Sequence, residues 1–94
     1  MHVRFSNDAR EDLLKIEAYL FDHAGEATAD QALRRILTRC HQLEARPMLG
    51  RTRPDIWSDA GSLLATPWLI VYRVTEGDVE TSRIVHQSRD LRAL

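Results

Sequence analysis

Two consecutive segments with apolar residues at helical spacing constrain the fold of this 94-residue sequence more than any other feature. In the first, intervals of four, three and four residues keep the apolar side chains on one face of a helix: Ala9, Leu13, Ile16 and Leu20. The second has a similar stripe, widened by Leu33 and Leu37, made of Ala29, Ala32, Ile36, Cys40 and Leu43. Two such helices form a hairpin whose apolar face needs a further layer to cover it.

Residues at the ends of these segments set the expected helix boundaries. Ser6 and Asn7 are good N-cap residues, so the first helix is expected to begin near residue 8. Gly25 can adopt the left-handed conformation that ends a helix. The second helix is expected from residue 27 or 28 to about residue 45, and the prolines and glycine of 46–55 predict a loop after it.

The rest of the chain reads as strands. Residues 62–66, 68–75 and 79–86 predict an antiparallel meander, with Pro67 and the turn 76–78 between its strands. Alternating residues in 2–6 predict a further short, half-buried strand. The expected fold is therefore α+β in one domain, 1–94: an N-terminal strand, a helical hairpin and a three-stranded antiparallel meander, with the helices on one face of the sheet. The side chains expected to be largely buried are Leu13, Ile16, Leu20, Ile36, Cys40, Leu43, Ile70 and Tyr72.

Composition limits where such a chain works. The longest apolar stretch, 68–72, is far shorter than the roughly 20 residues that cross a bilayer, and no signal-peptide core follows the N-terminus. The single cysteine, Cys40, excludes an internal disulfide. We therefore expect a cytoplasmic protein that does not bind membranes.

Charge is distributed unevenly along the chain. The formal net charge is -1, yet residues 31–53 hold six arginines and one acid. This basic block is compatible either with a solvated helix face or with a surface that binds a partner.

Several kinds of chemistry are disfavoured. The four histidines (His2, His23, His41 and His86) lie on separate predicted elements, which argues against a metal site. The sequence has neither a glycine-rich phosphate loop nor a G-x-S-x-G nucleophile elbow, and Cys40 falls on the apolar stripe of its helix. We expect no metal, no cofactor and no familiar enzyme template.

Candidate functional residues gather in the C-terminal half. Their arginines could hold a carboxylate or a phosphate through the planar guanidinium, and a histidine among them could carry a proton near neutral pH. The set is Arg51, Arg53, Arg73, Arg83, His86, Arg89 and Asp90. The competing structural interpretation is a local ion pair between Arg89 and Asp90, and a strand-end histidine bonded to backbone.

The order of these motifs resembles the ParE family of type II toxin-antitoxin toxins over essentially the whole chain. The opening match comprises Val3, Phe5, Ser6, Ala9, Asp12, Leu13, Ile16, Tyr19 and Leu20. The later matches are Ala32, Ile36, Leu43, Pro47, Gly50, Arg51, Arg53, the stretch 68–74, the stretch 83–86, Arg89 and Asp90. The resemblance implies a helical hairpin packed on an antiparallel sheet that includes the N-terminal strand.

The resemblance implies one of two activities. RelE-like members of the superfamily cut messenger RNA on the ribosome, whereas ParE-like members poison DNA gyrase. Three departures bear on the choice: Leu69 follows the aromatic residue where RelE relatives often carry an arginine, Gly61 and Ser62 stand where both branches commonly place one, and no tyrosine follows His86. They disfavour the nuclease, and the arginine missing at Gly61 and Ser62 also leaves open a toxin of low potency or an altered target. We therefore expect a gyrase inhibitor that acts by binding, not as an enzyme. The alternatives are a ribosome-dependent mRNA endonuclease and an inactive relative that only binds an antitoxin.

The resemblance also implies partners and sites. Target binding would use the candidate set given above, with no confident catalytic residue and with His86 as the catalytic candidate if the protein is an RNase. A ParD-like antitoxin would form a hetero-oligomer with the chain, using Arg34, Arg39 and Arg73. We do not expect direct binding of nucleic acid.

Overall fold

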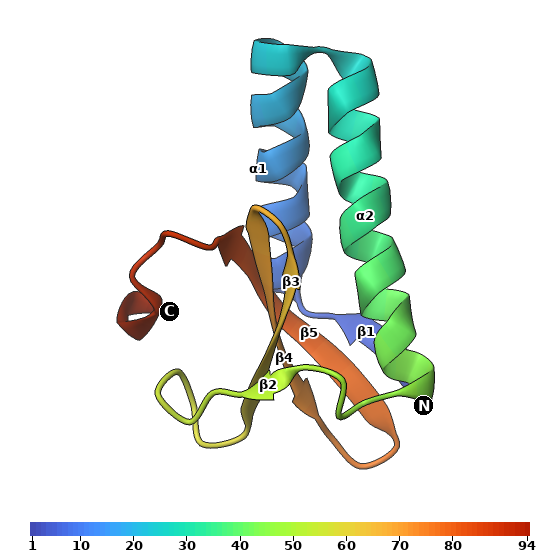
Figure 1. The fold of residues 1–94 in the computed structure, drawn as a ribbon, viewed down its shortest axis with the longest axis vertical. Coiled ribbons are helices and arrows are strands. Elements are labelled where there is room, and N and C mark those ends of the chain that lie inside the picture. Colours follow the sequence, from blue (N-terminus) through green and yellow to red (C-terminus); the bar gives the residue numbers. More distant parts are fainter.

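A computed structural model describes all 94 residues, and its helical hairpin stands against one face of a twisted sheet (Figure 1). The distal half of the hairpin rises clear of the sheet, and neither helix is long and apolar enough to cross a membrane. In chain order the elements are β1 (His2–Phe5), α1 (Asn7–Ala24), α2 (Glu26–Ala45), β2 (Arg51–Thr52), β3 (Ala60–Ala65), β4 (Trp68–Val74), β5 (Asp78–His86) and the 3-10 turn η1 (Leu91–Ala93).

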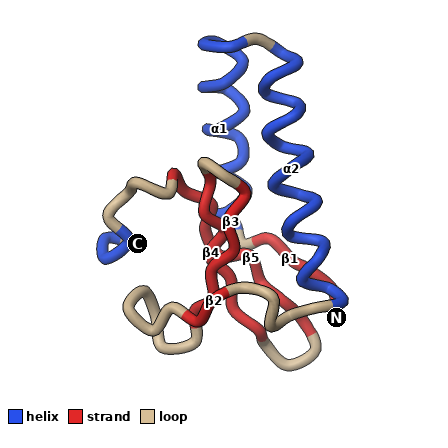
Figure 2. The backbone as a smooth tube through the Cα atoms, viewed as in Figure 1, coloured by secondary structure: helices blue, strands red, loops and turns tan.

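The sheet has the strand order β1-β5-β4-β3-β2 (Figure 2). Strands β3, β4 and β5 form the predicted antiparallel meander, and the helices cover one face as predicted. The expectation of a purely antiparallel sheet is wrong at one edge, because β1 runs parallel to β5. This direction carries β1 into the N-cap of α1: the Ser6 N–H bonds the Thr81 carbonyl, and the Ser6 Oγ accepts from the Ala9 N–H.

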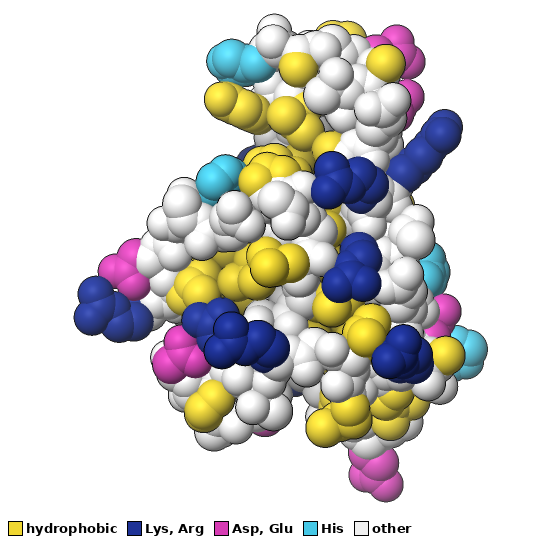
Figure 3. All heavy atoms as spheres, in the orientation of Figure 1, with side chains coloured by type: hydrophobic (Ala, Val, Ile, Leu, Met, Phe, Trp, Pro, Cys, Tyr) yellow, Lys and Arg dark blue, Asp and Glu magenta, His cyan; other side chains and the backbone are white.

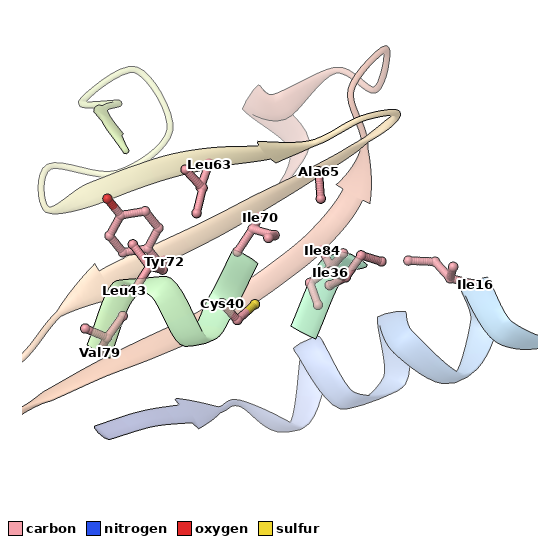
Figure 4. Packing of buried hydrophobic residues seen from close by; sticks show 10 residues of the cluster. All are labelled: Ile16, Ile36, Cys40, Leu43, Leu63, Ala65, Ile70, Tyr72, Val79 and Ile84. Atoms are coloured by element: carbon pink, nitrogen blue, oxygen red, sulfur yellow. The ribbon is translucent and has the colours of Figure 1, made fainter. Parts of the chain in front are cut away.

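The main core lies between α2 and the sheet (Figure 4). Of the eight side chains expected to be buried, six are: Ile16, Ile36, Cys40, Leu43, Ile70 and Tyr72. Leu13 and Leu20 are half-buried and pack against this cluster. Leu37, which was predicted to widen the apolar stripe of α2, is 36% exposed. Ile36 faces the core, and the next position along the helix is turned about 100° away from it, toward solvent.

A second, smaller cluster covers the other face of the sheet and explains why β4 is apolar on both faces. Its buried members are Ala60, Leu69, Val71 and Val85. The segment before β3 and the C-terminal turn cover it with half-buried Ile56, Trp57, Leu91 and Leu94. Every buried position of the middle strand therefore has an apolar neighbour layer.

Within the predicted loop 46–55, two residues pair with β3 as β2, and Tyr72 fixes this segment in place. The Tyr72 hydroxyl accepts a hydrogen bond from the Gly50 N–H at 3.1 Å and donates to the Pro47 carbonyl at 3.4 Å. A Cβ at Gly50 would overlap the Ser62 carbonyl, and one at Gly61 would lie 2.6 Å from the Tyr72 ring. The two glycines are needed so that the ring can cross the edge of the sheet.

Replacement of Ile36 by alanine tests the helix face. Ile36 is 0% exposed, so removing its side chain should lower the free energy of unfolding by about 2 to 5 kcal/mol. The matched control is Leu37→Ala on the solvent side of the same turn, which should cost less than about 1 kcal/mol. Denaturant unfolding of both variants measures the difference, and a loss below about 0.5 kcal/mol for Ile36→Ala would contradict the packing.

Candidate functional site

The largest hollow of the molecule, about 720 Å³, lies where α2, β2, β3 and the C-terminal turn meet. Three arginines from three segments line it: Arg39 on α2, Arg51 on β2 and Arg53 just after β2. Its apolar walls are the leucines Leu49, Leu63, Leu64, Leu69 and Leu91. No acid lines this hollow, so its chemistry suits an anionic group attached to an apolar one.

Arg51 and Arg53 differ in whether an acidic side chain already holds them. The Arg53 guanidinium holds Asp55 through two hydrogen bonds of 3.0 and 2.8 Å. These bonds lower the pKa of Asp55 and raise the pKa of Arg53, so the pair stays charged. Arg51 is exposed and has no acid within ion-pair distance, and its charge is available to a partner.

The arginines of α2 extend this surface along the edge of β3. Arg39 donates from Nε to the Leu64 carbonyl at 2.9 Å, and Arg35 donates to the Thr66 carbonyl at 2.7 Å. Arg34, Arg35 and Arg39 line a second hollow of about 400 Å³, which adjoins the first at Arg39 and Leu64. We call the two hollows together the basic groove.

Folding therefore gathers most of the basic block of the sequence on one surface. On the face shown in Figure 3, several basic side chains lie over the centre with hydrophobic side chains between them, other basic side chains project at the outline, and the acidic side chains lie toward the outline. The structure brings together Arg34, Arg39, Arg51 and Arg53 from the two predicted sets of binding residues.

Arg73 does not join this surface. It lies on β4, where its guanidinium stacks over the Trp57 ring at 4.9 Å and its Nε lies 3.8 Å from a carboxylate oxygen of Asp59. Trp57 covers the sheet face opposite the helices, so Arg73 and the α2 arginines are on different faces. The Arg73 Nε is buried without a hydrogen-bond partner. A single partner segment would have to pass around the sheet to contact Arg34, Arg39 and Arg73 together.

Arg83 is already engaged inside the protein. Its Nε and a terminal nitrogen donate to the two carboxylate oxygens of Asp12 at 2.8 and 3.2 Å, and this interaction raises the pKa of Arg83. Asp12 also accepts from the Ile84 N–H at 2.9 Å. Sequence reasoning missed this pairing, although Asp12 lies between Ala9 and Ile16 on the buried face of its helix, and an acid at such a position needs a buried partner.

The C-terminal candidates are exposed and loosely held. His86 ends β5, packs edge-on against Trp68 at 5.6 Å between ring centroids, and its Nδ1 lies 2.8 Å from the Ser88 hydroxyl. Asp90 bonds Arg92, which lowers the pKa of Asp90, and the local ion pair with Arg89 that the competing structural interpretation proposed does not form. Arg89 is exposed and has no acid within ion-pair distance.

Groups able to transfer protons are scarce in the basic groove. Ser62 and Leu69, which stand where the resemblance led us to look for arginines, line the large hollow together with Leu64, and none of the three carries a charged side chain. Burial raises the pKa of the Cys40 thiol to about 11, which removes it as a nucleophile near neutral pH. The groove can bind anions but lacks an acid-base pair within it.

Comparisons with known proteins agree with this architecture. Residues 3–91 match the family described as the ParE toxin of the type II toxin-antitoxin system parDE. Toxin ParE3 of Caulobacter vibrioides is 32% identical over 82 residues, which cover 87% of this chain and 82% of that protein. A solved chain from the chromosomal ParDE system of P. aeruginosa superposes with a TM-score of 0.81 over 92% of this chain and 95% of the other, at 22% identity.

The Asp12 interaction gives a test of this part of the structure. Asp12→Ala leaves the Arg83 charge and the Ile84 N–H without their partner, so the free energy of unfolding should fall by about 3 to 5 kcal/mol. Glu11→Ala, an exposed acid on the adjacent position of α1, should change it by about 0.5 kcal/mol or less. Urea unfolding of both variants gives the values, and equal losses would show that Asp12 does not join the helix to the sheet.

Proposed function

Because the chain belongs to the ParE family of type II toxin-antitoxin toxins, we propose that it arrests growth by binding DNA gyrase in the cytoplasm and that a ParD-like antitoxin neutralises it. The observation that carries the proposal is the basic groove, which offers arginine charges and leucine walls but no acid-base pair. Such a surface recognises a partner, and it does not supply what bond cleavage requires.

Target binding is assigned to Arg51 and Arg53 of the larger hollow and to Arg89, which directly follows the lining residue Ser88 in the chain. Arg51 and Arg89 are exposed and free of acids, and Arg53 reaches the same hollow while holding Asp55. Arginine is the residue best suited to such contacts because its planar fork binds carboxylates or phosphates in pairs of hydrogen bonds. Arg83 has a structural role and is left out of this surface.

Antitoxin binding is assigned to the α2 side of the groove. Arg34 and Arg39 are on this surface, and the leucine walls next to them suit a segment that presents both apolar and acidic side chains. A flexible antitoxin segment that becomes ordered on binding would bury this surface and cover part of the target-binding region, because both share the hollow lined by Arg39 and Arg51. Neutralisation would then be competition for one groove.

Charge-removal variants test the proposal. Arg51→Ala and Arg89→Ala should each weaken gyrase binding by about 3- to 10-fold and relieve growth arrest, because each removes an attraction made at the surface. The loss should be largest at low ionic strength, since salt screens the same attraction in the parent. Inhibition of gyrase supercoiling by purified variants, together with growth after induced expression, gives the measurement.

Two further variants make the test specific. Arg10→Ala removes an exposed arginine of α1 away from the groove and should behave like the parent. His86→Ala should keep most of the activity if its thermal melt is unchanged. A folded His86→Ala protein without toxicity, together with mRNA cleavage by the parent in a ribosome assay, would contradict the gyrase proposal and favour the RNase.

A further inference from the structure

The outer edge of β3 is only half covered by a neighbouring strand. β2 pairs with Gly61 and Ser62, and no strand pairs with Leu63, Leu64 or Ala65 on that side. An open strand edge presents backbone N–H and C=O groups that can pair with another chain. A protein with such an edge needs either a cover for it or a partner.

Two arginines of α2 cover this edge. The Arg39 guanidinium bonds the Leu64 carbonyl at 2.9 Å, and the Arg35 guanidinium bonds the Thr66 carbonyl at 2.7 Å. The two carbonyls are two residues apart, and every second carbonyl along an extended chain points to the same side; Thr66 directly follows the last residue of β3. Both hydrogen bonds are exposed to solvent, where a replacement donor can exchange with them at small cost.

The hollows of the basic groove flank this edge. The smaller one lies on the helix side, between Arg34, Arg35 and Thr38 of α2 and the end of β3. The larger one extends past Leu64 to Leu69 and Leu91, which belong to the opposite face of the sheet. Successive side chains of an added strand point to opposite faces, so such a strand would place alternate residues in the two hollows.

The chemistry of the two hollows defines the occupant. Five arginines and no acid line them together, and Leu64, Leu69 and Leu91 lie on the side away from the helices. An extended segment that alternates acidic with apolar side chains fits both, because its acids would meet Arg34 and Arg35 while its apolar side chains meet Leu64 and Leu69.

We propose that Arg35 and Arg39 are removable covers of the β3 edge, and that an acidic, apolar segment of the antitoxin displaces them by pairing with Leu64 as an added strand. The origin of the segment rests on the proposed function. Each hydrogen bond that is lost is replaced. Backbone N–H groups of the segment donate to the carbonyls of Leu64 and Thr66, and the released guanidiniums pair with acids of the same segment. The same two side chains thus keep other chains off the edge before binding and hold the correct one afterwards.

The covers are tested on the free protein first. Arg35→Ala with Arg39→Ala uncovers the edge, and this double variant should self-associate at a concentration at least about 10-fold lower than the parent in sedimentation analysis. The matched control, Arg10→Ala with Arg34→Ala, removes the same charge but no bond to a strand carbonyl, and should remain like the parent. Equal behaviour of the two folded double variants would overturn the idea of covers. If the uncovered variant melts early, Arg39→Lys serves in its place, because it keeps the charge and loses the planar fork.

Displacement of the two arginines is tested on a complex of this protein with the polypeptide encoded next to its gene. Amide hydrogen exchange at Leu64 should slow by at least about 10-fold on complex formation, and the Arg39 Nε–H should lose its bond to the Leu64 carbonyl, as seen by NMR. A complex with unchanged exchange at Leu64 would overturn strand addition. If this polypeptide does not bind at all, the antitoxin part of the proposed function fails, while the self-association experiment still decides whether the arginines are covers.

Discussion

The carboxylate of Asp12 joins the helical layer to the sheet, and the position of every other functional element depends on that junction. β1 pairs with β5 only as far as Thr81, and just beyond it the register of β5 against β4 shifts between Val71 and Tyr72. Asp12 takes the Ile84 N–H and the Arg83 guanidinium at this irregular place, and the Ser6 hydroxyl donates to the Ser82 carbonyl. A buried carboxylate costs free energy unless it is fully bonded, and three hydrogen bonds meet that requirement here.

With α1 fixed to β5, the hairpin places α2 across the sheet. One side of α2 then packs into the core and another side faces the edge of β3. Ile36, Cys40 and Leu43 fill the core, while Arg35 and Arg39 reach the edge of β3. Tyr72 fixes the far end of the groove by holding the segment before β2 through Gly50. The basic groove is therefore the place where the hairpin, the edge strand and the loop after α2 meet, and residues from separate parts of the sequence share one surface.

Helical spacing, caps and turn residues were sufficient to predict the hairpin, the meander and the helical face of the core, because each is a local pattern or follows from burial of a stripe. The parallel direction of β1 depends on its pairing with residue 78 and beyond, which no local pattern reports. The same holds for the site. Arginines 34, 39, 51 and 53 were identifiable as candidates, but their convergence, the separation of Arg73 and the internal pairing of Arg83 follow from tertiary contacts alone. For the Arg83 pairing the sequence does hold a signal that was overlooked: Asp12 is a lone acid on the apolar stripe of α1, which points to a buried partner but does not identify it as Arg83.

We propose that the protein acts on its target by charge-assisted binding through the basic groove. Titration of purified gyrase with the protein at a series of salt concentrations tests it most directly, with the antitoxin added in a parallel series. The claim predicts saturable binding whose affinity falls steadily as ionic strength rises, and loss of that binding when the antitoxin occupies the groove. Absence of gyrase binding at low salt, from a protein that still arrests growth, would contradict it.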